Sequence, residues 1–144
     1  MREIRTRRWT REEYHRMADS GVLSPDERVE LINGEIFRVT PQRSLHALGI
    51  RKAEETLRNV FVEGVDVRVR LPLALDPFSE PEPDVSVVRG SYLDYRDEHP
   101  RTAALVVEVS EATLIPDRDS KGSLYARAGI PEYWIVNLMG QRVE

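Results

Sequence analysis

Two acidic residues occupy positions where apolar side chains would be expected. Asp84 begins the apolar run DVSVV, and Glu108 lies inside LVVEVS with a valine on each side. An ionised carboxylate is costly to bury unless it is paired or bound to a metal. Carboxylates on two adjacent strands can converge on one point. Hard oxygen ligands at such a point suit Mg²⁺, which takes one or two carboxylates together with waters and substrate phosphate.

Lys121 is the third residue whose type could carry chemistry. Of the 21 basic residues only Lys52 and Lys121 are lysines, so a lysine in a special place is informative. Near a metal-bound phosphate, a lysine could position or deprotonate a water, or stabilise charge on the phosphate. The three residues together indicate metal-assisted chemistry on a phosphate ester.

Each of these residues also has a purely structural interpretation. Asp84 could cap or hydrogen-bond the loop before it. Glu108 could be the outward residue of a half-exposed strand, or one member of an ion pair. Lys121 could be a solvated residue on a helix. Spacing alone leaves both interpretations open for each residue.

Length and composition limit the class of protein. A chain of 144 residues, 40% of them hydrophobic, suits one compact domain with a real core. No apolar run approaches the ~18 residues of a membrane-spanning helix, and the charged N-terminus lacks the apolar stretch of a secretory signal. The absence of cysteine excludes disulfides and thiolate metal sites and favours a cytoplasmic protein. A net charge of −4 argues against nucleic-acid binding driven by bulk charge, although a local basic patch could still contact phosphate.

Helices and strands that could position these residues follow from the hydrophobic pattern. Thr10 with Glu13 forms a capping box that predicts a helix start, and Asn33-Gly34 predicts a tight hairpin. Strand, helix and strand near the C-terminus predict a crossover unit whose first strand is central in the sheet. The predicted elements are strands at about 28–32 and 35–39, a helix over 44–61 capped by Ser44, strands over 65–75, 84–88 and 103–110, a helix over 117–129 and a strand over 131–137.

Particular side chains are also expected to lie on particular faces. In the helix over 44–61, helical spacing places Val60 on the same face as Ile50 and Leu57. In the strand over 65–75, valines and leucines occupy one side and arginines the other. Pro72 indicates that this strand bends or lies at an edge. Tyr133 and Trp134 are expected in the core.

Five motifs in this sequence resemble those of the Uma2 family, which belongs to the PD-(D/E)xK nuclease-like superfamily. They are VELINGEIFRV, PDVSVV, LVVEVSEAT, DRDSK and YARAGIPEYWIVN, in the family's order and covering most of the chain from about residue 10. The resemblance implies an α/β fold (α+β, with a mixed sheet). Its restriction-endonuclease-like core would be a central mixed β-sheet flanked by helices.

The resemblance also implies roles for individual residues. Asp84 matches the aspartate of the superfamily motif and Glu108 its second acid, which makes both metal ligands, with the backbone carbonyl of Val109 as a third. The plain superfamily pattern has a lysine two residues after Glu108, where this chain has Ser110. In Uma2-like sequences the lysine comes from the following helix, and Lys121 fits that place.

Accessory residues follow from the same resemblance. Glu30 matches an acid of the N-terminal motif and could be an outer ligand, directly or through water. His46 is expected close to the site, although a histidine hydrogen-bonded at the rim of the core explains it equally well. Asp117 is expected to cap its helix or pair with Lys121. Four N-terminal arginines could touch a phosphate backbone, or form a solvated face: Arg5, Arg7, Arg8 and Arg11.

The functional expectation is a metal-dependent endonuclease that hydrolyses phosphodiester bonds of nucleic acid, DNA in the first place, with Mg²⁺ or Mn²⁺. The alternative is a catalytically inactive nuclease-fold module that binds nucleic acid or a protein partner, and a third possibility is a structural protein with no site. We expect residues 1–144 to form one domain that lacks the family's C-terminal strands. The exposed sheet edge favours a homodimer.

Overall fold

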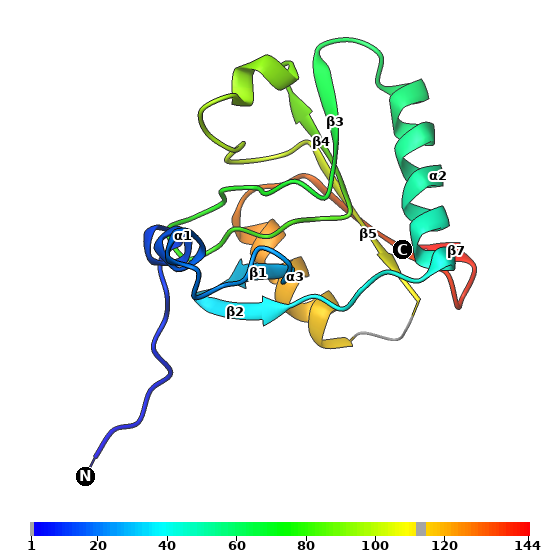
Figure 1. Ribbon diagram of the computed structural model, residues 1–144. Coiled ribbons are helices and arrows are strands. Elements are labelled where there is room, and N and C mark those ends of the chain that lie inside the picture. The colour runs from blue at the N-terminus through cyan, green and yellow to red at the C-terminus, as the bar shows by residue number, and fades with distance from the viewer. Residues whose placement is uncertain (1, 112–114) are drawn as a thin grey trace.

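The computed structural model describes residues 2–111 and 115–144, with side chains described for 2–111 and 120–144. A mixed sheet with the strand order β3-β4-β5-β6-β7 forms its centre (Figure 1). Neighbouring strands are antiparallel except for the parallel pair β5 and β6. As predicted, β5 is the central strand. The bounds are Val65–Val69 for β3, Val85–Arg89 for β4, Leu105–Ser110 for β5, Glu132–Asn137 for β6 and Arg142–Val143 for β7.

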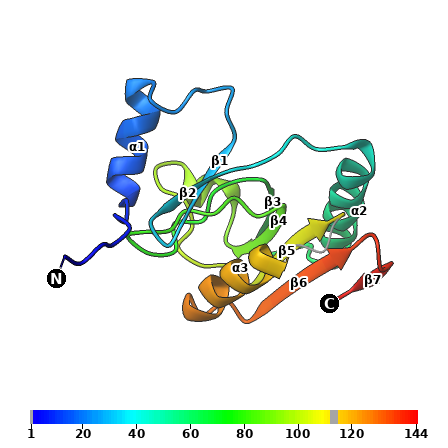
Figure 2. The same cartoon turned by 90° about the horizontal axis from the view of Figure 1, so that it is seen from below.

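Helices cover the two faces of this sheet. The long helix α2 (Ser44–Val60) packs on β3, β4 and β5, and the apolar cluster beneath it includes Val107 of β5. Val106 points to the opposite face and packs in a second cluster with Tyr125 of α3 (Ile115–Arg127). Figures 1 and 2 show α2 and α3 apart from each other, with β5 passing between them. The predicted mixed sheet flanked by helices is therefore confirmed.

The crossover from β5 to β6 runs through α3, as the sequence predicts. The helix ends in the manner expected of a C-terminal glycine, because Gly129 has a φ of 74°. Its N–H donates to the carbonyl of Ala126, and that of Ile130 donates to Tyr125, each at 3.1 Å. This ending turns the chain directly into β6.

A separate two-stranded sheet lies beside the central one. Its strands β1 (Val29–Ile32) and β2 (Glu35–Arg38) are antiparallel and joined by the predicted turn, in which Asn33 and Gly34 both have positive φ, 52° and 81°. Leu31 forms a bridge with Glu80, which ties β1 to the segment before β4. This hairpin is the support for Glu30.

The N-terminal helix α1 (Arg11–Ser20) packs against the same hairpin. Its capping box is present as predicted, with Thr10 accepting from the N–H of Glu13 at 3.1 Å. The hydroxyl of Tyr14 donates to the carbonyl of Val29 at 3.1 Å. Within the described residues, no helix is long and apolar enough to cross a membrane.

Two details at element ends differ from the sequence predictions. The N-cap of α2 is Arg43 rather than Ser44, and its side chain makes no capping hydrogen bond. Val60 is 67% exposed, because the next residue, Phe61, packs against the core in its place. The strand β3 lies at an edge of the sheet, as Pro72 indicates, but it ends at Val69 and is shorter than the strand predicted over 65–75.

Two large side chains also lie differently from the prediction. Arg68 was expected on the polar side of its strand but is buried, and its Nη2 donates to the carbonyl of Pro72 at 3.2 Å. Trp134 was expected in the core but is 38% exposed. Its neighbour Tyr133 packs against Tyr125 of α3 with the rings tilted, so Trp134 faces the opposite side of β6, beyond the main contacts of α2.

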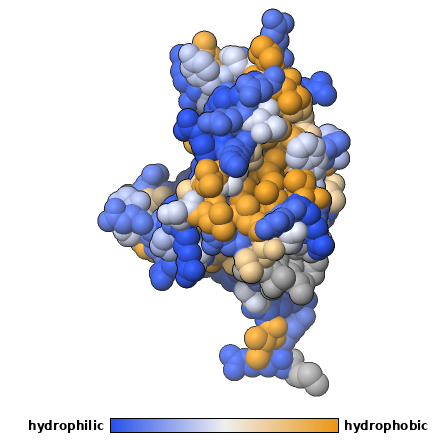
Figure 3. All heavy atoms as spheres, turned by 90° about the vertical axis from the view of Figure 1, so that its right-hand side faces the viewer, coloured by the Kyte–Doolittle hydropathy of each residue, from blue (hydrophilic) through white to orange (hydrophobic). Residues whose placement is uncertain are grey.

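The surface on the side of α2 carries a group of apolar side chains, visible as the orange area in Figure 3. Leu45 and Leu48 of α2 are each about half exposed, and Met139 and Val143 near the C-terminus are more so. The homodimer expected from the sequence stays a prediction.

The hairpin turn gives a test of the fold. A Cβ at Gly34 would lie 2.5 Å from the Cβ of Arg8, in addition to the cost of the positive φ. We expect Gly34→Ala to lower the free energy of unfolding by about 2–3 kcal/mol, measured by urea denaturation. The control is Gly21→Ala. Gly21 has a similar φ of 83°, but a Cβ added there would meet no neighbouring atom within 4 Å, so the substitution should cost about 1 kcal/mol. Equal losses would show that the contact with Arg8 is unimportant.

Candidate active site

Strand register brings the two predicted carboxylates together. Val85 of β4 pairs with Val107 of β5 in antiparallel register, so Asp84 and Glu108 stand opposite each other one step further along. Directly opposed residues have Cβ atoms about 5 Å apart and side chains on the same face. That face is the one covered by α3, because Val106, two residues before Glu108, packs against Tyr125.

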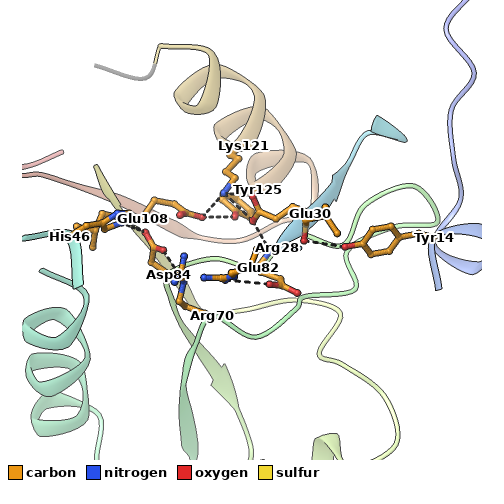
Figure 4. Close-up of polar contacts among 12 residues, drawn as sticks. Tyr14, Arg28, Glu30, His46, Arg70, Glu82, Asp84, Glu108, Lys121 and Tyr125 are labelled. Atoms are coloured by element: carbon orange, nitrogen blue, oxygen red, sulfur yellow. Dashed lines mark hydrogen bonds and ion pairs between the residues drawn. The ribbon is translucent and has the colours of Figure 1, made fainter. Parts of the chain in front are cut away.

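Lys121 reaches the carboxylates from α3. Its Nζ lies 3.2 Å from Oε1 of Glu108 and 3.1 Å from Oε1 of Glu30, and the residue is only 8% exposed. Glu30, on β1, also accepts the N–H of Glu82 at 2.8 Å. One ammonium group therefore joins an acid of the central sheet to an acid of the N-terminal hairpin (Figure 4).

Asp84 is held from several directions. Its Oδ2 accepts the backbone N–H of Val109 at 2.8 Å, and Nε2 of His46 lies 3.4 Å from the same oxygen. Its Oδ1 lies 3.7 Å from Nε of Arg70, which is too far for a hydrogen bond. The contact that Val109 makes with Asp84 thus comes from its amide. The role predicted for the Val109 carbonyl stays a prediction.

Tyr125 is a site residue that sequence reasoning missed. It is fully buried, and its hydroxyl donates to Oε1 of Glu108 at 3.0 Å. Because Tyr125 follows Lys121 by four residues on α3, the two side chains project from the same face of the helix. That spacing was the available signal, and one turn of helix supplies both donors to Glu108.

A pocket of about 330 Å³ opens over these residues. Its volume is at the lower end of the range for ligand sites in proteins. All five side chains expected at the site from the sequence line it, together with basic residues that were not predicted. The ionisable residues that line it are Glu30, Glu82, Asp84, Glu108, Arg28, Arg38, His46, Arg70 and Lys121.

Burial and neighbouring charges shift the pKa values of the two opposed carboxyl groups in opposite directions. Burial raises the pKa of Glu108 to about 8, against the opposing effect of Lys121 and with the charges of Asp84 and Glu30 adding to it. Burial also acts to raise the pKa of Asp84, but hydrogen bonds from His46 and Val109 outweigh it and leave that pKa below its ordinary value.

The cationic partners respond to the same charges. The hydrogen bond to Asp84 raises the pKa of His46 against the effect of burial. Burial acts to lower the pKa of Lys121, but the charges of Glu108 and Glu30 prevail and raise it well above its ordinary value. Lys121 is therefore a permanent ammonium group in this arrangement and supplies positive charge rather than a proton acceptor.

The donor set fits a hard divalent cation. Asp84 and Glu108 offer carboxylate oxygens from adjacent strands, which is the chemistry that Mg²⁺ prefers. Within the described part of the chain, no group of three or more His, Cys, Asp and Glu side chains has the arrangement of a metal site. An ion held here would take the two carboxylates and complete its coordination with backbone and water oxygens, as Mg²⁺ often does.

The remaining candidates from the sequence have other places. The side chain of Asp117 lies outside the described part of the chain. Arg7 pairs with Glu13 at 2.7 Å and Arg11 with Glu80 at 3.2 Å, and neither lines the pocket. The first ion pair links the N-terminal segment to α1, and the second links α1 to the segment before β4.

Removing the central ammonium group tests how the site is held together. Lys121→Met would leave Glu30 and Glu108 buried without their shared cation. Breaking a buried ion pair on one side costs about 3–5 kcal/mol, and we expect a loss of this size in urea unfolding at pH 9, above the pKa of Glu108. Lys52→Met, which changes the exposed lysine of α2, should alter stability by less than about 0.5 kcal/mol. Similar stability of the two variants would mean that Lys121 does not hold the carboxylates.

The pKa of Glu108 gives a prediction on pH. Its ordinary value is 4.5 and its value in the fold is about 8, so between these pH values the folded state holds a proton that the unfolded state lacks. The contribution of Glu108 to stability is therefore present at acidic pH and is lost as the pH rises towards 8. In metal-free buffer, Glu108→Gln should show a flatter dependence of unfolding free energy on pH from 5 to 8 than wild type. If the unfolding free energies of the two proteins depend on pH in the same way, the raised pKa of Glu108 is contradicted.

Comparison with known proteins places the chain in a family. The sequence model of the Uma2 family, described as putative restriction endonucleases, matches residues 11–144. No curated protein matches the sequence. Among solved structures, the fold is similar to that of a protein from Anabaena variabilis ATCC 29413, described as a putative nuclease belonging to DUF820. The TM-score is 0.69 at 14% sequence identity, with 89% of this chain and 73% of the other covered.

The structural likeness bears on the fold alone, since so few residues are identical. It agrees with the restriction-endonuclease-like core that the five motifs implied. The family match is broader evidence because it runs from the start of α1 to the last residue, through every element that lines the pocket. On this basis the chain belongs to the Uma2 family.

Proposed function

We propose that this protein is a divalent-metal-dependent nuclease that hydrolyses phosphodiester bonds of nucleic acid, DNA in the first place. The observation that carries the proposal is the opposition of Asp84 and Glu108 on adjacent strands, with Lys121 bound to Glu108 in the same pocket. The description of the family and the fold of its structural neighbour agree with a nuclease.

Each residue of the pocket has a task in such a reaction. When bound, Mg²⁺ or Mn²⁺ would polarise the scissile phosphate and lower the pKa of a water ligand. Asp84 and Glu108 would hold the ion. The Val109 amide and the Tyr125 hydroxyl fix the orientation of these two carboxylates, which is the usual work of groups behind metal ligands. Lys121 adds positive charge where negative charge develops on the phosphate oxygens.

One observation favours the alternative of an inactive nuclease-fold module. Lys121 is engaged by both Glu30 and Glu108, so the network is partly neutralised by the protein's own side chains. A module of this kind would bind nucleic acid or a protein partner without cleaving. Titration with Mn²⁺, followed by a shift in melting temperature, separates the two possibilities, because a site that has lost its metal gives no shift.

Cleavage of supercoiled plasmid tests the proposal directly. Wild type should nick the plasmid in Mg²⁺ or Mn²⁺ and stop when EDTA is added. Asp84→Asn and Glu108→Gln should each lower the rate by at least about 100-fold, the size of effect seen when one charge-stabilising group is lost. Asp97→Asn is the matched control, since the Asp97 side chain is 80% exposed and lines a different hollow.

Circular dichroism and melting curves should show that each variant is folded. The proposal fails if wild type does not cleave in either metal, or if Asp84→Asn and Glu108→Gln cleave as fast as Asp97→Asn.

A further inference from the structure

We propose that Arg70, with Arg28 beside it, binds a phosphate group of the nucleic-acid substrate. The inference rests on the proposed nuclease function, since the anion that it assigns to the pocket is a backbone phosphate. In Figure 4 the Arg70 guanidinium lies next to Asp84 and beside the pair formed by Arg28 and Glu82. Arg70 thus stands on the other side of Asp84 from Lys121.

Arg70 is only loosely paired in the fold, with Asp84 as its ion-pair partner. Its side chain is 19% exposed, and within the described residues its buried Nε makes no hydrogen bond. Arginine and carboxylate groups that pair for structural reasons form short, often bidentate contacts of about 2.7–2.9 Å. The 3.7 Å between Nε of Arg70 and Oδ1 of Asp84 is well outside that range. Asp84 therefore holds the Arg70 guanidinium only loosely, and the guanidinium keeps hydrogen-bonding capacity for a ligand.

The backbone at Arg70 is also unusual. Its φ of 54° is in the left-handed region, which is uncommon for any residue with a Cβ. Two other non-glycine residues of the described chain share this feature, Asn33 and Gln141, and both lie in the turns of hairpins. Arg70 instead directly follows β3, where its N–H donates to the carbonyl of Asp84 at 3.1 Å. Strain of this kind concentrates at functional sites, and here it places the arginine against Asp84.

The other basic residues of the pocket are more firmly engaged. Lys121 is bound by two carboxylates, and Arg38 pairs with Glu27 at 2.8 Å and points to solvent. Arg28 has a looser pair, 3.5 Å from Glu82, and its charge repels that of Arg70. An anion between the two guanidinium groups would relieve this repulsion. Arginine is suited to the task because its planar group binds two phosphate oxygens at once.

Affinity for a labelled oligonucleotide tests this assignment without depending on cleavage. Fluorescence anisotropy would be measured in Mg²⁺ with Glu108→Gln as the background, so that the strand stays intact. Adding Arg70→Gln should weaken binding by at least about 10-fold and Arg70→Lys by less, because lysine keeps the charge but loses the two-point contact. Arg101→Gln, which removes an arginine that is 79% exposed and lies outside this pocket, should leave the affinity within about 2-fold.

Salt dependence separates a phosphate contact from a structural role. Losing one contact should reduce the slope of log affinity against log salt concentration by about 0.7–0.9. A residue that only positions Asp84 would leave that slope unchanged. An unchanged slope and affinity in Arg70→Gln, or no binding of the oligonucleotide by the background protein, would overturn the inference. If Arg70→Gln does not fold, Arg28→Gln takes its place, because Arg28 belongs to the same proposed phosphate site: a slope smaller by a similar amount supports the inference, and an unchanged slope and affinity overturns it.

The same variants distinguish this inference from the nuclease proposal. In the wild-type background, Arg70→Gln should raise the KM for plasmid cleavage more than it lowers kcat. If wild type cleaves and Arg70→Gln has an unchanged KM, the phosphate contact of Arg70 is wrong and the nuclease proposal still holds. If wild type does not cleave but Arg70→Gln binds the oligonucleotide more weakly, the phosphate contact holds and the nuclease proposal is wrong.

Discussion

Burial of carboxylates at one place is the constraint around which the structure is arranged. Glu30, Asp84 and Glu108 lie together with little exposure to water, and each needs donors or cations to remain there. These donors and cations come from the helices on both faces of the sheet and from the sheet itself. α3 contributes an ammonium and a hydroxyl group, β5 an amide, and α2 an imidazole. These groups together satisfy all three acids, which explains why so many polar contacts meet at this end of β4 and β5.

The division of labour among the cations follows from this arrangement. Lys121 lies between two acids and is occupied in holding them. Arg70 approaches Asp84 from the other side but makes no short contact with it. The first cation joins two acids of the pocket, and the second is the one that we propose for phosphate binding. A lysine supplied from a helix, instead of from the strand position taken by Ser110, is compatible with this division because α3 lies directly over Glu108.

Much of the fold was accessible from local sequence. Asn33-Gly34 is constrained by the positive φ of its turn, and Thr10 with Glu13 by helix capping, so both were predictable from a few residues. Asp84 and Glu108 stood out because acids are rare in apolar strands. Tyr125 offered only its helical spacing from Lys121, and nothing in the local sequence marked Arg70. Their roles depend on the rotation of α3 over the sheet and on a single backbone reversal after β3, which alternation does not reveal. Arg68 shows the same limit, since a long side chain can bury its stem while its head reaches a carbonyl.

Glu30 reaches the site from a sheet that is separate from the one carrying Asp84 and Glu108. The pocket therefore lies on the seam between the N-terminal hairpin and the central sheet, and Lys121 links the two through its ion pairs with Glu30 and Glu108. Arg28 comes from the same side of the seam as Glu30, while Arg70 comes from the other. The spacing of the two guanidinium groups therefore depends on how the hairpin sits against the central sheet, whereas the opposition of Asp84 and Glu108 is set by the register of β4 and β5.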